Sequence, residues 1–343
     1  MATKISFKPK QVTKQILSHL QDRAHDVISK RFGLTEDAER KTLEAIGEMY
    51  GITRERVRQI ENAALTSIKK SDQYKSMDGV FAELKSLINE MGAVVPEDEF
   101  LDLISKDKSV QNHIHLYLVL GDHFTKHKED EHFNPRWAVD HELTDKVHDS
   151  LKKLYENLED DELLTEPEII SQFFTHLSDV SEHFRKEEIA KRWLKISKKI
   201  SKNPLGEWGR TDSSNVKTRG IKDYAFLVMR KHGSPMHFKE VAKAIESTFG
   251  KKTHVATCHN ELIKDSRFVL VGRGIYALKE WGYEGGVVRD VIKKIIKKDG
   301  PLTKEDIIDR VLKERYLKRN TILVNLQNAK YFKKTKNGQY TIV

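Results

Sequence analysis

The stretch GITRERVRQIE, residues 51–61, concentrates charged and amide side chains in one short segment. Four of them fall within about one and a half turns of a predicted helix: Arg54, Glu55, Arg58 and Gln59. Helical spacing projects several of them to one side, opposite Val57 and Ile60. Arginine can donate two parallel hydrogen bonds to guanine, glutamate can accept one from the cytosine amino group, and glutamine can pair with adenine. The pattern therefore predicts a base-reading helix. The alternative is a surface helix whose Arg and Glu side chains form salt bridges with one another.

Two helical patterns meet at the start of this stretch. Apolar residues recur at helical spacing on both sides of it, at Leu43, Ile46, Met49, Val57, Ile60, Ala64, Leu65 and Ile68. Between them, Gly51 can end the first helix in a left-handed conformation, and Thr53 can cap the second. Two helices joined by so short a glycine-containing turn predict a helix-turn-helix.

Residues 42–70, TLEAIGEMYGITRERVRQIENAALTSIKK, resemble region 4, the promoter-reading helix-turn-helix at the C-terminal end of sigma-70 family transcription initiation factors. The preceding HDVISKRFGLTEDAERK extends the resemblance to about residues 20–70. The resemblance implies that the second helix enters the major groove of a −35-type promoter element. By position, the residues that match base-facing ones are Arg54, Glu55, Arg58 and Gln59, and those that match residues near phosphates are Thr53 and Arg56. One departure is that Asn62, Ala63 and Thr66 stand where basic residues are common in the family.

A complete sigma factor carries an upstream portion that grips the polymerase clamp and melts the promoter. Only some 20 residues precede the resemblance in this sequence. We therefore expect a chain that is not a self-sufficient sigma factor.

A loose repeat of about 60 to 70 residues runs through the rest of the chain. Each unit has a long amphipathic helix, two shorter helices and a strand-like run. In the last two units, 221–283 and 286–343, the run alternates about a glycine turn, at Gly274 and Gly338, which predicts a β-hairpin. Three helices followed by a hairpin predict a winged helix. Earlier residues repeat the pattern less clearly.

GSPMHFKEVAKAI, followed by DSRFVLVGRGIYALKEWG, resembles the winged-helix domain named HARE-HTH over about residues 222–283. That domain also forms the N-terminal part of the delta subunit of bacterial RNA polymerase. It occurs besides in chromatin proteins and beside restriction-enzyme modules. The resemblance implies contact with DNA or with polymerase, without choosing between them.

Together these patterns predict a mainly α, multi-domain chain with small β-hairpins, in which a sigma-type helix-turn-helix is followed by tandem winged-helix units. The expected order is a basic N-terminal arm, the helix-turn-helix, two winged-helix-like units, a polar linker, the HARE-type winged helix and a C-terminal winged helix. Their expected ranges are, in that order, 1–23, 24–75, 77–140, 141–208, 209–220, 221–283 and 286–343.

Basic segments outside the helix-turn-helix predict contacts with DNA phosphates. In KRWLKISKKISK, residues 191–202, cations alternate with apolar residues, as expected for a third helix that packs inward and turns its cations outward. A solvated charged face is the alternative. The predicted phosphate-binding residues beyond Thr53 and Arg56 are Lys195, Lys198, Lys199, Arg273, Lys318, Arg319, Lys333 and Lys334. Such contacts add affinity and salt dependence without sequence information.

The composition supports a polyanionic partner without establishing one. The chain has 343 residues, with 61 Lys and Arg against 52 Asp and Glu, a net charge of +9. A merely soluble basic protein would show the same balance. The single cysteine, Cys258, excludes an intramolecular disulfide and a multi-cysteine zinc site, and its amphipathic surroundings predict a buried side chain.

Other constellations favour no enzymatic chemistry. Histidines gather in residues 113–132, at His113, His115, His123, His127 and His132. Two-residue spacing on a helix sends side chains to different faces, so we expect surface or partly packed histidines and no metal site. The acidic runs at 129–131 and 156–162 are expected to be solvated turns. No nucleophile elbow, P-loop or dinucleotide fingerprint occurs, so we expect no catalytic residues and no cofactor.

The sequence thus predicts a bacterial, sequence-specific DNA-binding transcription regulator, cytoplasmic and associated with the nucleoid. Its expected partner is double-stranded DNA, with bacterial RNA polymerase core as a second candidate, and no apolar run is long enough for a membrane span. One alternative is a polymerase-associated protein that acts through protein contacts, in the manner of the delta subunit. Another is the targeting part of a restriction or defence system. The target site, the sign of regulation and the oligomeric state stay open.

Overall fold

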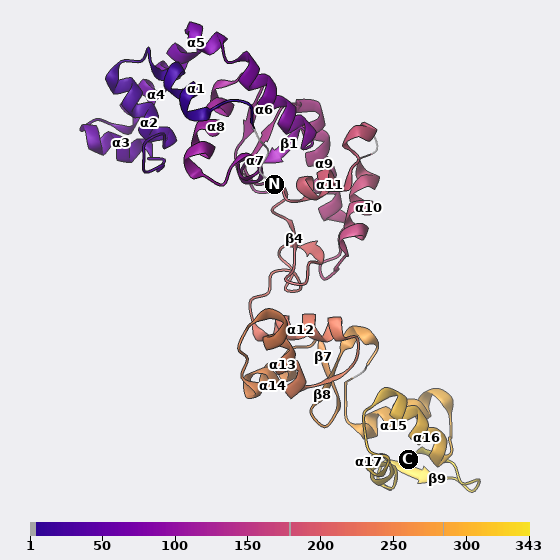
Figure 1. Ribbon diagram of the computed structural model, residues 1–343. Coiled ribbons are helices and arrows are strands. Elements are labelled where there is room, and N and C mark those ends of the chain that lie inside the picture. Colours follow the sequence, from indigo (N-terminus) through magenta and orange to yellow (C-terminus); the bar gives the residue numbers. More distant parts are fainter. Residues whose placement is uncertain (1–4, 178–179, 284) are drawn as a thin grey trace. The chain divides into compact units, whose positions relative to one another are not determined.

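The fold is mainly helical. A computed structural model describes residues 5–177, 180–283 and 285–343. Within them, helices alternate with small antiparallel sheets of two or three strands (Figure 1). The predicted fold class, a sigma-type helix-turn-helix followed by winged-helix units, is confirmed.

The chain divides into two compact units. The first comprises residues 1–202 and 208–211, and the second comprises 203–207 and 212–343. Each unit has buried apolar clusters of its own.

The first unit begins with a group of five helices: α1 (Pro9–Leu17), α2 (Asp22–Phe32), α3 (Leu43–Tyr50), α4 (Arg54–Lys70) and the short α5 (Asp72–Lys75). As the sequence predicts, α3 ends at Gly51, which has a φ of 63°, and the Thr53 side chain caps α4 by accepting a hydrogen bond from the Arg56 amide. Val27, Ile46 and Val57 form a small buried cluster among α2, α3 and α4. These local signals fix the angle at which α4 leaves the turn.

The segment predicted to be a basic N-terminal arm is folded. Helix α1 buries Thr13, Ile16 and Leu17, and the Thr13 hydroxyl lies 2.7 Å from the hydroxyl of Tyr117. Tyr117 also donates a hydrogen bond to the carbonyl of Pro9. Because apolar residues of α1 complete a core built by later helices, this segment belongs to the first unit.

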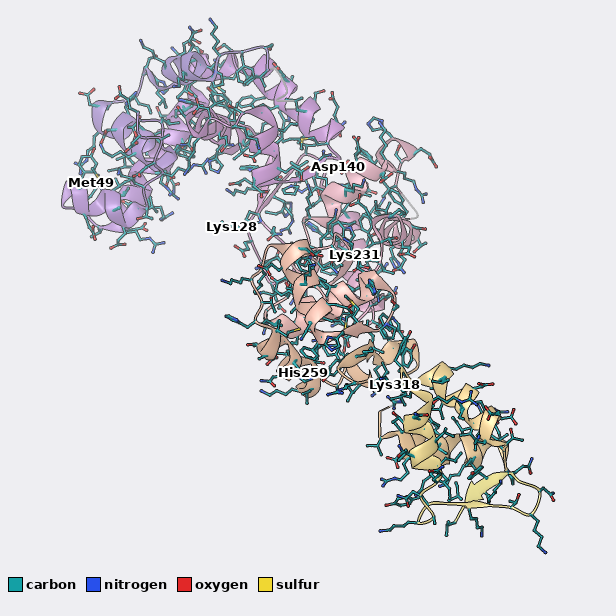
Figure 2. The ribbon with its side chains drawn as sticks, turned by 60° about the horizontal axis from the view of Figure 1, so that its bottom comes forward. Met49, Lys128, Asp140, Lys231, His259 and Lys318 are labelled. Carbon is teal, nitrogen blue, oxygen red and sulfur yellow. The ribbon has the colours of Figure 1, made fainter. Side chains whose placement is uncertain are left out.

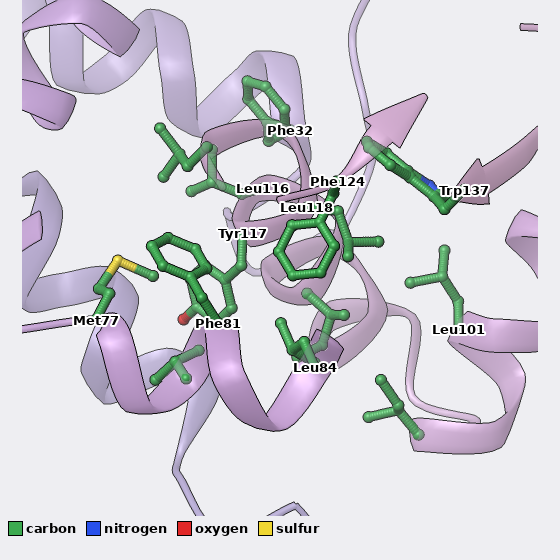
Figure 3. Close-up of a cluster of buried hydrophobic side chains, with 14 of the residues drawn as sticks. Phe32, Met77, Phe81, Leu84, Leu101, Leu116, Tyr117, Leu118, Phe124 and Trp137 are labelled. Atoms are coloured by element: carbon green, nitrogen blue, oxygen red, sulfur yellow. The ribbon is translucent and has the colours of Figure 1, made fainter. Parts of the chain in front are cut away.

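The next elements form a winged helix around the core of Figure 3. They are α6 (Asp78–Glu90), β1 (Val94–Pro96), α7 (Glu97–Ile104), α8 (Lys108–Leu120), β2 (Thr125–His127) and β3 (Arg136–Ala138). Strand β3 lies between β1 and β2, antiparallel to both. Phe81, Leu84 and Trp137 pack in the same core as Phe32 of α2 and Ile68 of α4. The helix-turn-helix and this winged helix are therefore one packed body.

A second winged helix completes the first unit. Its elements are α9 (His141–Asn157), α10 (Glu166–His176), the 3₁₀ turn η1 (Glu182–Phe184), α11 (Glu187–Leu194), β4 (Ile200–Lys202) and β5 (Trp208–Arg210). The helical pattern of residues 191–202 predicts a longer helix, but α11 ends at Leu194 and the chain turns into β4. Trp208 exchanges two backbone hydrogen bonds of 2.8 Å with Leu164, which ties β5 to the segment before α10.

The segment predicted to be a linker is largely ordered by hydrogen bonds. Its first residues lie in β5, and Asn215 is 2% exposed. The Arg267 guanidinium donates to Asn215 Oδ1 at 3.0 Å and to Asp223 Oδ1 at 2.8 Å. Asp223 in turn caps α12 by accepting from the Gly220 amide. Polar composition here reflects buried pairing as well as solvent contact.

The HARE-type region is a winged helix with a three-stranded sheet in the order β6-β8-β7. Its elements are α12 (Ile221–His232), β6 (Met236–His237), α13 (Phe238–Phe249), α14 (Val255–Lys264), β7 (Phe268–Gly272), β8 (Ile275–Leu278) and η2 (Lys279–Trp281). The hairpin turn falls at Gly274 as predicted, with a φ of 72°. A Cβ there would lie 2.7 Å from Nε2 of His237, so the turn packs closely on the start of α13.

The C-terminal winged helix consists of α15 (Val288–Asp299), α16 (Lys304–Glu314), α17 (Arg319–Leu326), β9 (Phe332–Lys334) and β10 (Tyr340–Ile342). Its connection between α16 and α17 is hydrogen-bonded to the HARE-type sheet. The Tyr316 amide donates to the Val271 carbonyl at 2.9 Å, and the buried Arg315 donates to the carbonyls of Leu270 and Gly286. These bonds join the two winged helices of the second unit.

Among the described residues, no helix has both the length and the apolar character that crossing a bilayer requires.

Candidate nucleic-acid interface

The polar residues of α4 form an exposed surface on a firmly packed helix. Val57, Ala64 and Ile68 bury its inner face, with at most 3% of each residue exposed. The four predicted base-reading side chains all lie on the exposed side: Arg54, Glu55, Arg58 and Gln59. Thr53 and Arg56, which were predicted to lie near phosphates, are exposed beside them. The structure thus brings together the whole set that the sequence singles out around residues 53–59.

Within this surface, Arg58 and Glu55 are paired. The Arg58 Nε and Nη2 atoms donate to the two Glu55 carboxylate oxygens at 2.8 and 2.6 Å. The hydrogen bonds from Arg58 lower the pKa of Glu55, and those to Glu55 raise the pKa of Arg58. More than half of each side chain is exposed, so water screens the pair and it contributes little to stability. The salt-bridged arrangement is therefore one that a base edge can replace.

Contacts with α2 hold α4 and its turn. Arg31 of α2 forms an ion pair with Glu61 of α4 at 3.3 Å and donates to the Lys41 carbonyl at 3.2 Å. Asp26 of α2 accepts hydrogen bonds from Lys30 and from the hydroxyl of Tyr50 at the end of α3. Because both helices of the motif are fixed to α2, the exposed side chains of α4 project from a rigid support.

The third helix of the first winged helix is not available to a ligand in the same way. Helix α8 buries nearly all of its length, including His113, Ile114, His115 and Leu116. Asn112 of α8 donates to the Gly33 and Ala38 carbonyls, both at 2.9 Å. A helix covered on several sides cannot enter a DNA groove, so this unit supports the helix-turn-helix.

The third helix of the second winged helix, α11, packs against the first. Trp193 is fully buried and its Nε1 donates to the Gly92 carbonyl at 3.1 Å. Arg192 donates to the Met91 carbonyl at 2.7 Å. Gly92 has a φ of 116°, and a Cβ there would lie 2.7 Å from Ile189 of α11. The inner face of α11 is therefore part of an internal interface.

The lysines that follow α11 are paired with carboxylates of the first winged helix. Lys195 lies 3.0 Å from Glu99. Lys198 and Lys199 lie 2.6 and 3.3 Å from Glu129 and Glu131. The acidic run at 129–131, expected to be a solvated turn, is in fact the partner of this basic segment. These pairs compete with phosphate for the three lysines.

Helix α14 of the HARE-type winged helix exposes a surface of a different kind. The residues that face outward are nearly all uncharged: Val255, Ala256, Thr257, Asn260, Ile263 and Lys264. Arg273, a predicted phosphate ligand, is exposed at the turn between β7 and β8. A helix with one cation offers few contacts to a phosphate backbone and is suited to base edges, methyl groups or a protein surface.

In the C-terminal winged helix, the predicted phosphate ligands lie at the start of α17 and on the wing. Lys318, Lys333 and Lys334 are exposed. Arg319 is also exposed but pairs with Glu305 of α16. Here the structure leaves most of the sequence-predicted cations turned to solvent.

The histidines do not form a metal site within the described residues, where no group of three or more potential ligands gathers. His113 and His115 are both buried, because α8 is covered on both of the faces that the two-residue spacing selects. His113 Nδ1 lies 2.8 Å from the Thr13 hydroxyl, and the His115 ring packs edge-on to Trp137. Cys258 is buried as predicted, and burial raises its pKa to about 11.

Comparison with known families supports two of these regions. Residues 16–70 match the family model described as sigma-70, region 4. Residues 219–281 match the HARE-HTH model, whose description names the helix-turn-helix domain of ASXL proteins and restriction endonucleases. The first match spans α2, α3 and α4, and the second spans the winged helix from α12 to η2. The chain thus joins a segment similar to sigma-70 region 4 to one similar to HARE-HTH, and both matches indicate DNA-binding helix-turn-helix domains.

Proposed function

We propose that the chain is a bacterial, sequence-specific DNA-binding transcription regulator that reads a promoter-like, −35-type element with helix α4. The observation that carries the proposal is the exposed polar face of α4, on a helix-turn-helix that matches sigma-70 region 4. Its partner is double-stranded DNA. On this proposal the protein acts at the nucleoid in the cytoplasm and has no catalytic role.

The proposed mechanism follows from the side chains on that face. Arg54 and Arg58 present guanidinium groups for guanine, Glu55 presents a carboxylate for cytosine, and Gln59 presents an amide for adenine. Arg58 leaves Glu55 when it meets a base, so both members of the pair become available. The Thr53 hydroxyl and Arg56 are placed at the helix start, where they would contact phosphates and fix the register.

A binding experiment with paired duplexes tests the proposal. The full chain is titrated, at one fixed salt concentration, into a duplex that contains a −35-like hexamer and into a duplex of the same length with that hexamer scrambled. We expect tighter binding to the first. Equal affinity for both duplexes would show that α4 does not read sequence.

A second candidate function is a polymerase-associated protein that acts mainly through protein contacts. The uncharged outer face of α14, within the HARE-HTH match, favours it. In that case the chain would co-purify with core RNA polymerase after nuclease treatment and would not bind free duplex DNA. Loss of the association on nuclease treatment would exclude this candidate.

A further inference from the structure

The net positive charge of the chain is confined to its C-terminal winged helix. Residues 286–343 contain 15 Lys and Arg and six Asp and Glu, a net charge of +9. The whole chain also has a net charge of +9, so the preceding residues are balanced at 46 of each sign. A field that attracts a polyanion therefore comes from this module.

Within the module, the acidic residues are confined to its first half. No Asp or Glu follows Glu314, whereas seven cations do. Residues 315–343 supply α17 and the wing, β9 and β10. The third helix and the wing thus form a surface without carboxylates of its own.

Five lysines of this surface have no acidic partner within 4.0 Å among the described residues: Lys318, Lys330, Lys333, Lys334 and Lys336. All five are exposed. Lys318, labelled in Figure 2, is the N-cap residue of α17. Of the other two cations, Arg315 is buried and Arg319 pairs with Glu305.

A second group of cations surrounds the ring of Tyr331. Arg289 and Lys293 of α15 lie 4.4 and 4.5 Å from the ring centroid, and Lys330 lies 5.8 Å from it. Like charges held this close repel one another, and a bound anion relieves the repulsion. The arrangement extends the basic surface from the wing onto α15.

The basic stretch 191–202 provides the contrast. All six of its cations are paired with carboxylates in the first unit: Lys191, Arg192, Lys195, Lys198, Lys199 and Lys202. Two lysine-rich segments that look alike in sequence therefore differ in the structure, since one is neutralised internally and the other is not.

We propose that the C-terminal winged helix, residues 286–343, anchors the chain to the phosphate backbone of duplex DNA without regard to sequence, while α4 supplies the sequence preference. The inference rests on the proposed function, because it takes duplex DNA as the partner. Duplex DNA fits this surface because it carries one negative charge per about 1.7 Å of helix axis, and its condensed counterions are released as lysines replace them.

Salt dependence of binding by the full chain tests the assignment. The wing variant, Lys333→Gln with Lys334→Gln and Lys336→Gln, is compared with a control that removes the same charge, Lys195→Gln with Lys198→Gln and Lys199→Gln. Dissociation constants for the specific and the scrambled duplex are measured from about 50 to 200 mM salt. The wing variant should lower the slope of log K against log salt by about 2 to 3 and weaken both duplexes equally, at least about tenfold at ~0.1 M salt.

The control should leave the slope unchanged, and thermal unfolding followed by circular dichroism checks that each variant is folded. A slope unchanged in the folded wing variant, or one lowered as much in the control, would overturn the anchor. So would the absence of binding to any duplex at low salt, or tighter binding to poly-glutamate than to DNA. Failure of the proposed reading function gives a different result: both duplexes bind equally in the unaltered chain, while the wing variant still lowers the slope.

Discussion

At the scale of single residues, the pair between Arg58 and Glu55 determines what α4 presents to a ligand. The pair is exposed and bidentate, so the guanidinium is held in a defined plane before any base arrives. Its geometry resembles the two parallel hydrogen bonds that guanine accepts. An exposed pair of this kind is easily exchanged, and the discrimination rests on what replaces it.

We expect Arg58→Ala to reduce discrimination between the specific and the scrambled duplex by about 5-fold to 150-fold, the range of one bidentate base contact. Affinity for the scrambled duplex should change much less. The matched control is Arg185→Ala, which removes the same charge from an exposed site on the first unit away from α4. Discrimination that is intact in Arg58→Ala, or lost equally in the control, contradicts the assignment.

The buried histidines give the first unit a predictable response to acid. Burial, together with the nearby Arg136 guanidinium, lowers the pKa of His148 to about 3, and Arg136 Nε donates to its Nε2 at 2.7 Å. The unfolded chain, with a histidine pKa near 6.5, binds this proton more readily than the folded one. Stability is therefore complete above about pH 6.5 and is lost as the pH falls toward about 3.

Each such histidine should cost about 1.4 kcal/mol of unfolding free energy per pH unit between those limits. His148→Gln keeps an acceptor for Arg136 and cannot take up the proton, so it should flatten this slope. Urea unfolding followed by tryptophan fluorescence at several pH values measures it. His183→Gln, at an exposed site, is the control and should match the unaltered chain. An unaltered slope in His148→Gln contradicts the prediction.

At the scale of elements, the role of each winged helix depends on whether its third helix is covered. Helices α8 and α11 are packed into the first unit, whereas α14 and α17 expose an outer face. The same arrangement of three helices and a hairpin therefore provides support in one unit and a binding surface in the other. Gly92 is the residue on which the packing of α11 depends most directly.

We expect Gly92→Ala to destabilise the first unit by about 1–3 kcal/mol, because the added methyl group meets Ile189 and Trp193 at a φ of 116°. Gly79→Ala is the control, since Gly79 lies in α6 with nothing within 4 Å of an added Cβ. It should be neutral or slightly stabilising. Denaturant unfolding at neutral pH measures both, and equal stability of the two variants would argue against the close contact.

At the scale of the whole molecule, function is divided between the two compact units. The first carries the predicted reader, α4, and the second carries the HARE-HTH match and the exposed lysines of the C-terminal winged helix. Within the second unit, the hydrogen bonds of Arg315 and Tyr316 join the basic module to the HARE-type sheet.

Arg315→Ala should lower the stability of the second unit by about 1.5–3 kcal/mol, because it removes charged donors from the carbonyls of Leu270 and Gly286. Thermal unfolding followed at Trp281 measures the effect. Arg310→Ala, which removes a surface ion pair with Asp299, should have little effect. If both variants unfold at the same temperature as the unaltered chain, the two winged helices are not coupled through Arg315.

The sequence by itself determined the local elements of this protein. Gly51 and Thr53 specify the turn of the helix-turn-helix, and Gly274 specifies a hairpin, because capping and left-handed backbone are properties of a few adjacent residues. The exposed set on α4 follows from helical spacing, which is also local.

Only the tertiary structure decided which helices are covered and which cations are free. Thr13 meets Tyr117 across 104 positions, so a segment with the composition of an arm becomes part of the core. Lys198 meets Glu129 across 69 positions, so a basic run is neutralised by an acidic run. Such pairings depend on which elements pack together, and neither composition nor spacing along the chain encodes that directly.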